Sequence, residues 1–465
     1  MPKVGKTAKI ILCVVLLFGF RPFKSPSFQK VKTKNGIEVI YFKAKKTPLF
    51  EISMYYNYGS TQDPVGKSGL AELAINLFDR GAKGNSENVL SEKFDSIAGG
   101  HDFAVSQDYA ILRFWGLNSD LESALDLIFL LLKDSRINSA VFSRIKKNHL
   151  ESVNRVKEHP QSLASHVFNM VLFNNSIRAR PTYGLREDLK KIQPKDLKNF
   201  QKEMFRTDRL RVLVVGGSDR HEVLDPFLRR LEELPLPRKK TIDREPEAYI
   251  IDSAHLKNGS LLIVNRPKLL ETHIRLGFIG PSRRVPELHE LQIAETVLGG
   301  SYGSRLNQIL REKLNLTYSI DAGFYYSKDD SVFLVSSSTH VEKFAKFYIE
   351  LKKELKRFVE DGISEDELKD AKSYLTGSFF IGLENIYSVA NMLFKNLLYG
   401  IKSGFLEEYR ERITKITVDD VHRAIQKYYK LDEIKAVVVS DAKALSKELK
   451  KAGIGFTERK ADRFL

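Results

Sequence analysis

The sequence predicts an α+β protein of two homologous domains, each a mostly antiparallel sheet covered by helices on one face. Two similar segments, 34–40 and 257–263, place Lys-Asn-Gly before an apolar run, which is typical of a turn entering a strand. A second strand pattern follows each of them, at 50–56 and 272–278, and then an amphipathic helix that stops at glycine. The nearly constant separation of the copies indicates an internal duplication rather than an array of short repeats.

The two copies also end alike. Apolar runs at 210–217 and 434–441 follow helical patterns and predict buried strands that close each sheet. The stretch between the copies is rich in proline and charge, which is typical of a linker. We therefore expect an N-terminal domain over 27–233, a linker over 234–250 and a C-terminal domain over 251–465.

Residues 1–26 form a separate segment. Lys3, Lys6 and Lys9 precede an eleven-residue apolar run at 10–20, which is the order of a secretory signal peptide. A membrane-spanning helix needs about 20 apolar residues, and no clean small-residue cleavage site follows, so cleavage and retention as an anchor both stay open. We expect an exported bacterial protein, either periplasmic or associated with the membrane through residues 10–20.

Composition narrows the class of protein. The 465 residues are 42% hydrophobic and 29% charged, which is ordinary for a globular chain. A single cysteine excludes an internal disulfide framework and a cysteine-based zinc or iron–sulfur site. The net charge of +16 is spread along the chain without a nucleic-acid-binding motif, so we expect no nucleic-acid partner.

An amphipathic helix is predicted over 69–81, ending at a glycine. Glu72, Ile75 and Asn76 share a face of this helix at i, i+3 and i+4. One carboxylate and one amide without an imidazole make a poor zinc site, so packing in the core is the favoured interpretation. His149 has no partner four residues away and is expected to be an ordinary core or surface side chain.

The second copy carries a different pattern. A glycine-rich segment, Gly299–Gly303, leads into a helix capped by Ser304, and a strand is predicted from Tyr318 onward. Arg311 in this helix offers a planar fork of donors, and the Tyr318 hydroxyl is a neutral donor; both suit a developing oxyanion. The alternative is an arginine paired with an acid of its own helix and a tyrosine that packs in the sheet.

The first of these patterns resembles the zinc helix of the pitrilysin-like (M16) metallopeptidases, the family of mitochondrial processing peptidase and insulin-degrading enzyme. That helix carries the inverted motif His-x-x-Glu-His between Gly-Leu-Ala and a later glycine. Glu72, Ile75 and Asn76 stand at its three positions, and Glu151 lies at the distance of the family's third ligand. The resemblance implies a degenerate site, so we expect this chain to bind no metal and no other cofactor.

The second pattern resembles the family's Gly-Gly, Ser-Arg-Leu, Leu-Arg-Glu-Lys and Leu-x-Tyr-Ser segment. In the family an arginine and a tyrosine seven residues later reach toward the zinc half, bind the substrate backbone and stabilise the oxyanion. Arg311 and Tyr318 stand at these positions, and Gly299, Gly300 and Gly303 are expected to contact substrate. The resemblance implies the M16/LuxS-like metallohydrolase fold in a clam-shell arrangement.

The resemblance covers about residues 30–455, and some members of the family divide catalysis between two subunits. We expect a non-catalytic, substrate-binding or regulatory subunit of a heterodimeric zinc peptidase, acting on peptides or unfolded proteins. Its partner would carry the intact His-x-x-Glu-His motif and the zinc. Alternatives are a scaffold, a stand-alone peptide-binding protein, or an atypical peptidase with a metal at Glu72, Asn76 and Glu151. Segment 99–106 is the candidate for a peptide-binding strand edge, with a plain turn as the alternative.

Overall fold

The computed structural model describes most of the chain. The described residues are 28–44, 47–136, 138–174, 176–217, 220–238, 255–382, 385–400 and 405–464. The predicted N-terminal segment 1–26 and the greater part of the predicted linker lie outside them. No helix within the described ranges is long and apolar enough to cross a membrane.

The first half of the chain builds a six-stranded sheet. In spatial order its strands are β1 (Phe28–Lys32), β2 (Glu38–Lys43), β8 (Leu210–Gly216), β3 (Leu49–Tyr56), β7 (Ala110–Leu117) and β6 (Gly100–Val105). Neighbouring strands are antiparallel except for β2 and β8, which are parallel. A small hairpin joins β4 (Gly81–Ala82) to β5 (Asn85–Ser86).

The second half repeats this sheet. In the corresponding order its strands are β14 (Thr457–Lys460), β9 (Leu261–Asn265), β13 (Lys435–Ser440), β10 (Glu271–Gly280), β12 (Ser331–His340) and β11 (Ile320–Tyr326). Its parallel pairs are β9 with β13 and β9 with β14. Five strands of the two sheets correspond in order and direction, whereas the sixth differs, since β1 is antiparallel to β2 and β14 is parallel to β9. This correspondence confirms the predicted α+β class, the duplication and the mostly antiparallel pairing.

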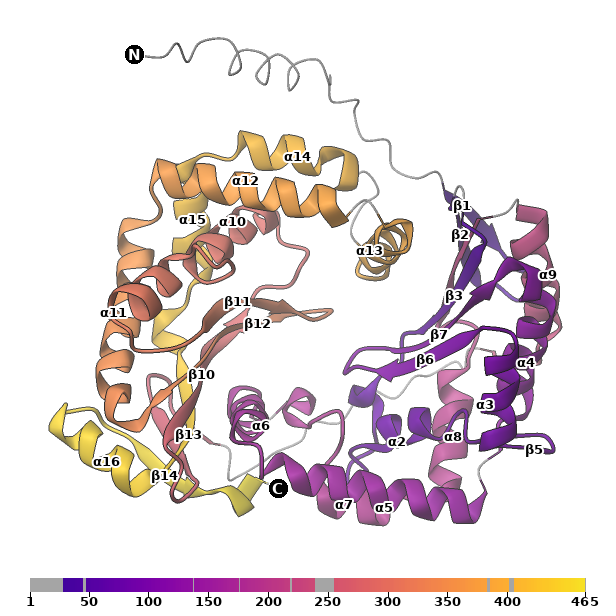
Figure 1. Ribbon diagram of the computed structural model, residues 1–465, viewed down its shortest axis with the longest axis horizontal. Coiled ribbons are helices and arrows are strands. Elements are labelled where there is room, and N and C mark those ends of the chain that lie inside the picture. Colours follow the sequence, from indigo (N-terminus) through magenta and orange to yellow (C-terminus); the bar gives the residue numbers. More distant parts are fainter. Residues whose placement is uncertain are drawn as a thin grey trace, which may run out of the picture.

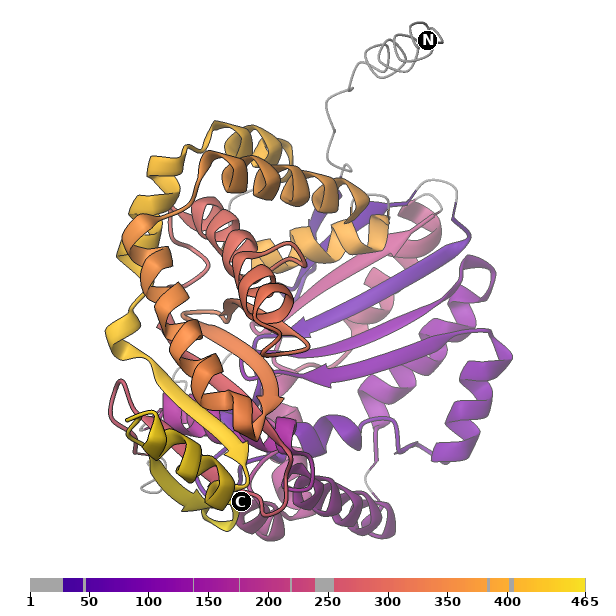
Figure 2. The same ribbon diagram turned by 60° about the vertical axis from the view of Figure 1, so that its left-hand side comes forward.

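Helices other than α6 (Pro160–Leu172) and α13 (Ile386–Leu398) cover the outer sides of the two sheets, and Figures 1 and 2 show the two halves side by side. The first half contributes α2 (Leu70–Asn76), α3 (Glu87–Ser96), α4 (Leu121–Asp134), α5 (Ser139–Val156), α6 (Pro160–Leu172), α7 (Arg186–Lys191), α8 (Pro194–Met204) and α9 (Arg220–Glu233). The second half contributes α10 (Leu288–Leu298), α11 (Phe344–Asp361), α12 (Glu365–Gly382), α13 (Ile386–Leu398), α14 (Phe405–Lys415), α15 (Val418–Tyr428) and α16 (Ala442–Lys451).

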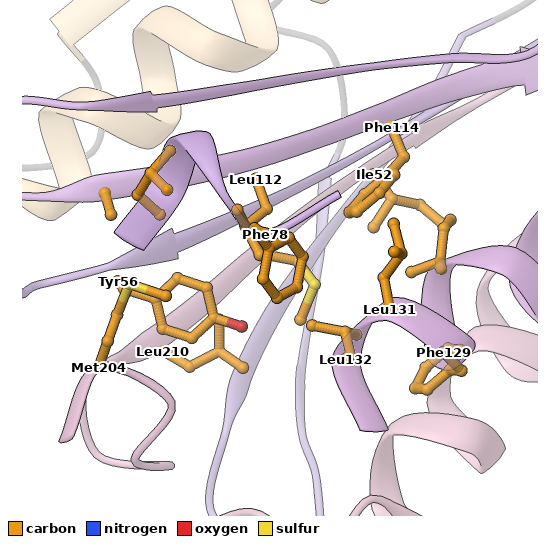
Figure 3. Close-up of a cluster of buried hydrophobic side chains, with 14 of the residues drawn as sticks. Ile52, Tyr56, Phe78, Leu112, Phe114, Phe129, Leu131, Leu132, Met204 and Leu210 are labelled. Atoms are coloured by element: carbon orange, nitrogen blue, oxygen red, sulfur yellow. The ribbon is translucent and has the colours of Figure 1, made fainter. Parts of the chain in front are cut away.

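The core of the first half lies between its sheet and these outer helices. Ile52 and Phe114 project from the strands toward Leu131 of α4, and Leu112 lies beside Phe78, as Figure 3 shows. All five side chains are buried, and burial of such side chains is the main favourable term in folding.

The helix predicted over 69–81 is shorter than expected, because α2 ends at Asn76. The chain then turns, and Phe78 enters the core edge-on to Phe103 of β6. Asp79 in this turn lies 3.1 Å from the Nε2 atom of His101, also on β6. These contacts of Phe78 and Asp79 with strand β6 therefore favour a chain reversal after Asn76 over an extension of helix α2.

The inner faces of the two sheets are covered reciprocally. Helix α6 of the first half lies on β10 and β13 of the second sheet, where Phe168 packs among apolar side chains of β9 and β13. Helix α13 of the second half lies on the first sheet, where Phe394 contacts the ring of Tyr55 at a centroid separation of 4.5 Å. The prediction of helices on one face is therefore incomplete, since each half supplies the inner cover of the other.

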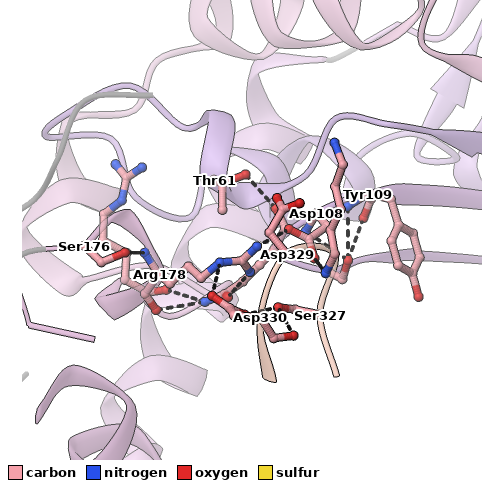
Figure 4. A network of polar contacts seen from close by, with 12 residues as sticks. Thr61, Asp108, Tyr109, Ser176, Arg178, Ser327, Asp329 and Asp330 are labelled. Carbon is pink, nitrogen blue, oxygen red and sulfur yellow. Dashed lines mark hydrogen bonds and ion pairs between the residues drawn. The ribbon is translucent and has the colours of Figure 1, made fainter. Parts of the chain in front are cut away.

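A polar network also joins the halves at the turn between β11 and β12, as Figure 4 shows. The Arg178 guanidinium pairs with Asp108 of the first half at 2.8 Å and with Asp330 of the second at 3.2 Å. The Lys328 backbone N–H donates to Asp108 at 2.9 Å. Because Arg178 and Asp108 are largely buried, loss of either would leave a charge with poor solvation.

The exchange of α6 predicts that a truncation in the first half loosens the second sheet. We expect Phe168→Ala to lower the free energy of unfolding by about 3–5 kcal/mol and to speed amide exchange in β9, β10 and β13. The matched control is Phe129→Ala, which truncates an equally buried ring inside the first core. Hydrogen-exchange mass spectrometry that finds faster exchange confined to the first sheet in both variants would contradict this prediction.

Candidate functional site

Helix α2 is held in place by a buried carboxylate. Asp63 accepts hydrogen bonds from the backbone N–H groups of Gly69 at 2.8 Å and Ala71 at 2.9 Å, at the start of the helix. Gly69 has φ of 93°, and a side chain there would clash with Leu189 and the backbone of Tyr183. Burial raises the pKa of Asp63 to about 7, although the two backbone donors oppose that shift.

The three motif positions of α2 have different surroundings. Ile75 is buried in the first core, whereas Glu72 and Asn76 are partly exposed. Burial raises the pKa of Glu72, and the charge of His149 on α5 and a hydrogen bond with Asn76 oppose the rise. Glu72, Asn76 and His149 therefore lie in one neighbourhood.

Glu151, the residue at the distance of the third ligand, is exposed on α5. Positions 149 and 151 of a helix point about 200° apart, so the helix that turns His149 toward α2 turns Glu151 away from it. The Nε2 atom of His149 is 2.8 Å from the Tyr183 carbonyl and is occupied by that contact. Counting residues from α2 located the right helix but could not give its rotation.

A zinc ion does not fit this donor set. One carboxylate and one amide remain where the family has two imidazoles, and an isoleucine stands in place of the acid. No group of three His, Cys, Asp or Glu side chains in the described part of the chain is arranged to hold a metal ion. The helix keeps its place in the fold through apolar packing and through the Asp63 carboxylate at its start.

The glycine-rich loop of the second half follows α10. The N–H groups of Gly299 and Gly300 both donate to the Glu295 carbonyl, at 3.0 and 2.8 Å. A Cβ on Gly299 would lie 2.5 Å from the Cβ of Ala322 on β11, so close packing against the strand requires glycine there. Gly303 has open space around it. Two of the three predicted substrate-binding glycines thus have a packing reason of their own.

Arg311 lies close to two exposed aromatic rings. It belongs to a π-helical segment, Asn307–Lys313, and its guanidinium carbon is 4.5 Å from the ring centre of Tyr302 and 5.7 Å from that of Tyr318. The tyrosines are 68% and 85% exposed. Arg311 forms no hydrogen bond or ion pair with the described residues, so its donors face solvent with the rings holding its position. The structure brings together the predicted pair and adds Tyr302.

Sequence reasoning missed Tyr302. The only signal available was an aromatic residue inside a glycine-rich loop, and such a residue has no periodicity from which a neighbour can be inferred. Its exposure and its distance to Arg311 become visible only once the loop folds back over the π-helical segment.

The two sheets end in homologous edge strands, β6 and β11, whose outward backbone groups differ. The Ser106 N–H donates to the Tyr109 carbonyl, and in an antiparallel pair every second residue directs its backbone groups toward the neighbouring strand. The residues between them, His101, Phe103 and Val105, therefore direct their backbone groups away from β7. Within the described ranges these outward groups have no hydrogen-bond partner. Strand β6 therefore offers an open edge, at the segment predicted for one.

Strand β11 is closed in comparison. Its outward Phe324 N–H donates to the Glu295 carboxylate, and its outward Ile320 carbonyl accepts from the Asn307 side chain at 3.0 Å. The Tyr326 hydroxyl donates to the same carboxyl group at 3.1 Å. Burial raises the pKa of Glu295 to about 8, and the donors oppose that rise.

Replacement of Ile75 tests whether α2 serves only as core. We expect Ile75→Glu to lower the free energy of unfolding by about 3 kcal/mol, because it buries a carboxyl group without a partner. The matched control introduces the same residue at an exposed helical position, Ser91→Glu on α3, and should change stability by less than about 0.5 kcal/mol. Equal urea denaturation curves for the two variants would show that the site still accommodates an acid.

The buried Glu295 predicts a pH dependence of stability. The folded chain holds this proton up to about pH 8, whereas an unfolded glutamate releases it near pH 4.5. The free energy of unfolding should therefore fall as pH rises between these values, by at most about 1.4 kcal/mol per pH unit. Asp63, whose pKa is raised to about 7, adds a slope of the same sign below pH 7, so the contribution of Glu295 is separable between about pH 7 and 8. Glu295→Gln keeps the acceptor oxygen and should flatten this part of the dependence in urea denaturation, whereas the exposed control Glu312→Gln should not. A wild-type slope between about pH 7 and 8 that persists in Glu295→Gln would contradict this origin.

Two sequence profiles match the chain in succession. The profile "Insulinase (Peptidase family M16)" matches residues 38–184, and "Peptidase M16 inactive domain" matches residues 191–375. An uncharacterized zinc protease of Rickettsia bellii is 22% identical over 417 residues, which are 89% of this chain and 97% of the relative. A Helicobacter pylori protein named non-peptidase homolog YmxG is 23% identical over 413 residues, with coverages of 88% and 92%.

Solved structures show the same fold. A peptidase M16 inactive domain from Pseudomonas fluorescens superposes with a TM-score of 0.79 at 22% identity, covering 89% of this chain and 98% of that one. The periplasmic protease PqqL from Escherichia coli gives 0.75 at 16% identity, covering 90% of this chain and 46% of that one. The chain therefore belongs to peptidase family M16, as a member whose zinc-motif positions hold Glu72, Ile75 and Asn76.

Proposed function

We propose that this chain is the non-catalytic, substrate-binding subunit of a two-chain M16 zinc peptidase. The observation that carries the proposal is Arg311, which has no ionic partner among the described residues and is flanked by two exposed tyrosines. An arginine held in this way contributes little to folding, but it is ready to bind a carbonyl or carboxylate oxygen. The zinc side of the same fold has meanwhile become core, with Ile75 at the position of the acid.

In this proposal the partner subunit carries the intact His-x-x-Glu-His motif and binds the zinc. Arg311 and Tyr318 of this chain act on a peptide in the partner's active site. The guanidinium and the phenol donate hydrogen bonds to the substrate carbonyl oxygen as negative charge develops on it. Tyr302, whose ring centre is 4.5 Å from the guanidinium carbon, helps to hold the guanidinium in position.

The open edge of β6 supports a peptide or unfolded protein as the substrate. An extended chain can add to an exposed strand edge through main-chain hydrogen bonds, independently of most of its sequence. His101, Phe103 and Val105 offer such groups, whereas Glu295 and Asn307 close the homologous edge of β11. The first half thus binds the backbone, and the second half supplies the polar donors.

We further propose that the complex works outside the cytoplasm. The support is the signal-like order of residues 1–26 and the periplasmic location of one structural neighbour, PqqL. A stand-alone peptide-binding protein is the second candidate, because the β6 edge alone would suffice for it.

The test begins with affinity purification of the tagged chain from its own organism, followed by protein sequencing, zinc analysis and a peptidase assay of the eluate. We expect a second M16 chain with His-x-x-Glu-His, about one zinc per pair and peptide hydrolysis. A chain that elutes alone and inactive refutes the two-subunit proposal and favours stand-alone peptide binding. A second chain without zinc or activity favours a scaffold.

In the purified two-chain complex, Arg311→Ala should lower kcat/KM by about a hundredfold or more, because removal of one oxyanion donor typically lowers the rate by about that factor. The matched control is Lys313→Ala, which removes an exposed positive charge from the same helix. Co-purification of the partner with both variants separates loss of catalysis from loss of assembly. Unchanged turnover by Arg311→Ala would assign this chain a scaffold role.

A further inference from the structure

Trp115 occupies an unusual position beside the open edge. It is the only tryptophan of the chain, lies on β7 and is 41% exposed. It pairs directly with Gly100, the first residue of β6. A Cβ on Gly100 would lie 2.5 Å from Cζ2, 2.6 Å from Cε2 and 2.9 Å from Nε1 of the indole. The indole therefore lies across the backbone of β6, and only glycine leaves room for it.

This arrangement brings an aromatic surface from the second strand toward the edge of the sheet. A polypeptide that pairs with β6 would lie about 4.8 Å beyond it. Residues paired across neighbouring strands project to the same face of a sheet, so the peptide residue opposite Gly100 would project beside the indole. Because Gly100 has no side chain, nothing on β6 separates the two at this point.

We propose that Trp115 and Gly100 form a subsite for one apolar or aromatic side chain of an extended polypeptide bound along β6. The inference rests on the proposed function in taking a peptide as the ligand, and it adds a preference at one position. The occupant is argued from the open backbone groups of His101 and Phe103, which an extended chain can pair with and a globular surface cannot. The indole N–H has no acceptor among the described residues and remains available to the peptide.

The neighbouring side chains limit the preference to a single position. The next residues on the same sheet face are Asp102 of β6 and Arg113 of β7. The Arg113 guanidinium lies 3.9 Å from Asp102 and 3.6 Å from Glu51. A peptide side chain two residues from the subsite would therefore meet charged groups, and an apolar side chain gains nothing there.

The lone tryptophan allows a direct test with the full chain. The probes are two short, soluble, tryptophan-free peptides of high strand propensity, which differ only in a central Phe or Ala. We expect the Phe peptide to shift the Trp115 emission to shorter wavelength and to bind about tenfold more tightly than the Ala peptide. Saturable binding is followed independently by the anisotropy of a dye on the peptide.

The decisive variant is Trp115→Ala, in which the Phe and Ala peptides should bind with equal affinity. Gly100→Val, which displaces the indole, should also remove the preference, with circular dichroism as the check on folding. The matched control is Tyr374→Ala, which removes a half-exposed aromatic ring from α12 and should leave the preference intact.

A Phe preference that survives in Trp115→Ala overturns the subsite, and so does a lack of saturable binding of both peptides to the wild-type chain. Failure of the proposed function is distinguishable from these results. If the chain purifies without a zinc-bearing partner and still prefers the Phe peptide through Trp115, the subsite stands and the two-subunit proposal falls.

Discussion

The reciprocal cover of the two sheets is the constraint on which the remainder of the structure depends. Each sheet has an outer face buried by helices of its own half and an inner face that its own half leaves uncovered. Helices α6 and α13 cover much of these inner faces by exchange, with Phe168 and Phe394 buried against the opposite sheets, and leave the β6 end of the first sheet uncovered. Because neither half buries its inner face alone, apolar packing fixes the relative position of the two halves. The ion pairs of Arg178 at the β11–β12 turn add a contact of defined geometry between the halves.

Within that frame the duplicated halves have diverged at their edges. An uncovered strand edge exposes unpaired backbone groups and is a liability unless it is protected or used. Strand β11 is protected by a carboxyl group and an amide, Glu295 and Asn307, at the cost of a buried acid whose pKa is raised to about 8. Strand β6 lacks this protection and carries the exposed Trp115 beside it. One fold thus supplies a closed edge in one half and an open edge in the other.

The sequence contained the repeat and most of the strands, because apolar runs after Lys-Asn-Gly and at the end of each half are local signals. It also singled out Arg311 and Tyr318, which lie near one another because only a short segment separates the π-helical segment from Tyr318, just before β11. It could not show which sheet an amphipathic helix covers, because the apolar faces of α6 and α13 look the same whichever partner buries them. The rotation of α5, which decides between His149 and Glu151, is likewise set by tertiary contacts.

The distribution of polar groups separates what folding requires from what it does not. An acid at position 75 without a metal would be a buried, unpaired carboxyl group, so an apolar residue stabilises the fold there. No comparable gain explains Tyr302 and Tyr318, because most of each ring remains in water, or an arginine without an anionic partner among the described residues. Helix α2 of the first half therefore carries at position 75 a residue that stabilises the fold. The second half, in contrast, carries Arg311 with two exposed tyrosines, which stability alone does not favour. That contrast is what a retained binding role predicts, and a pure scaffold gives no reason for it.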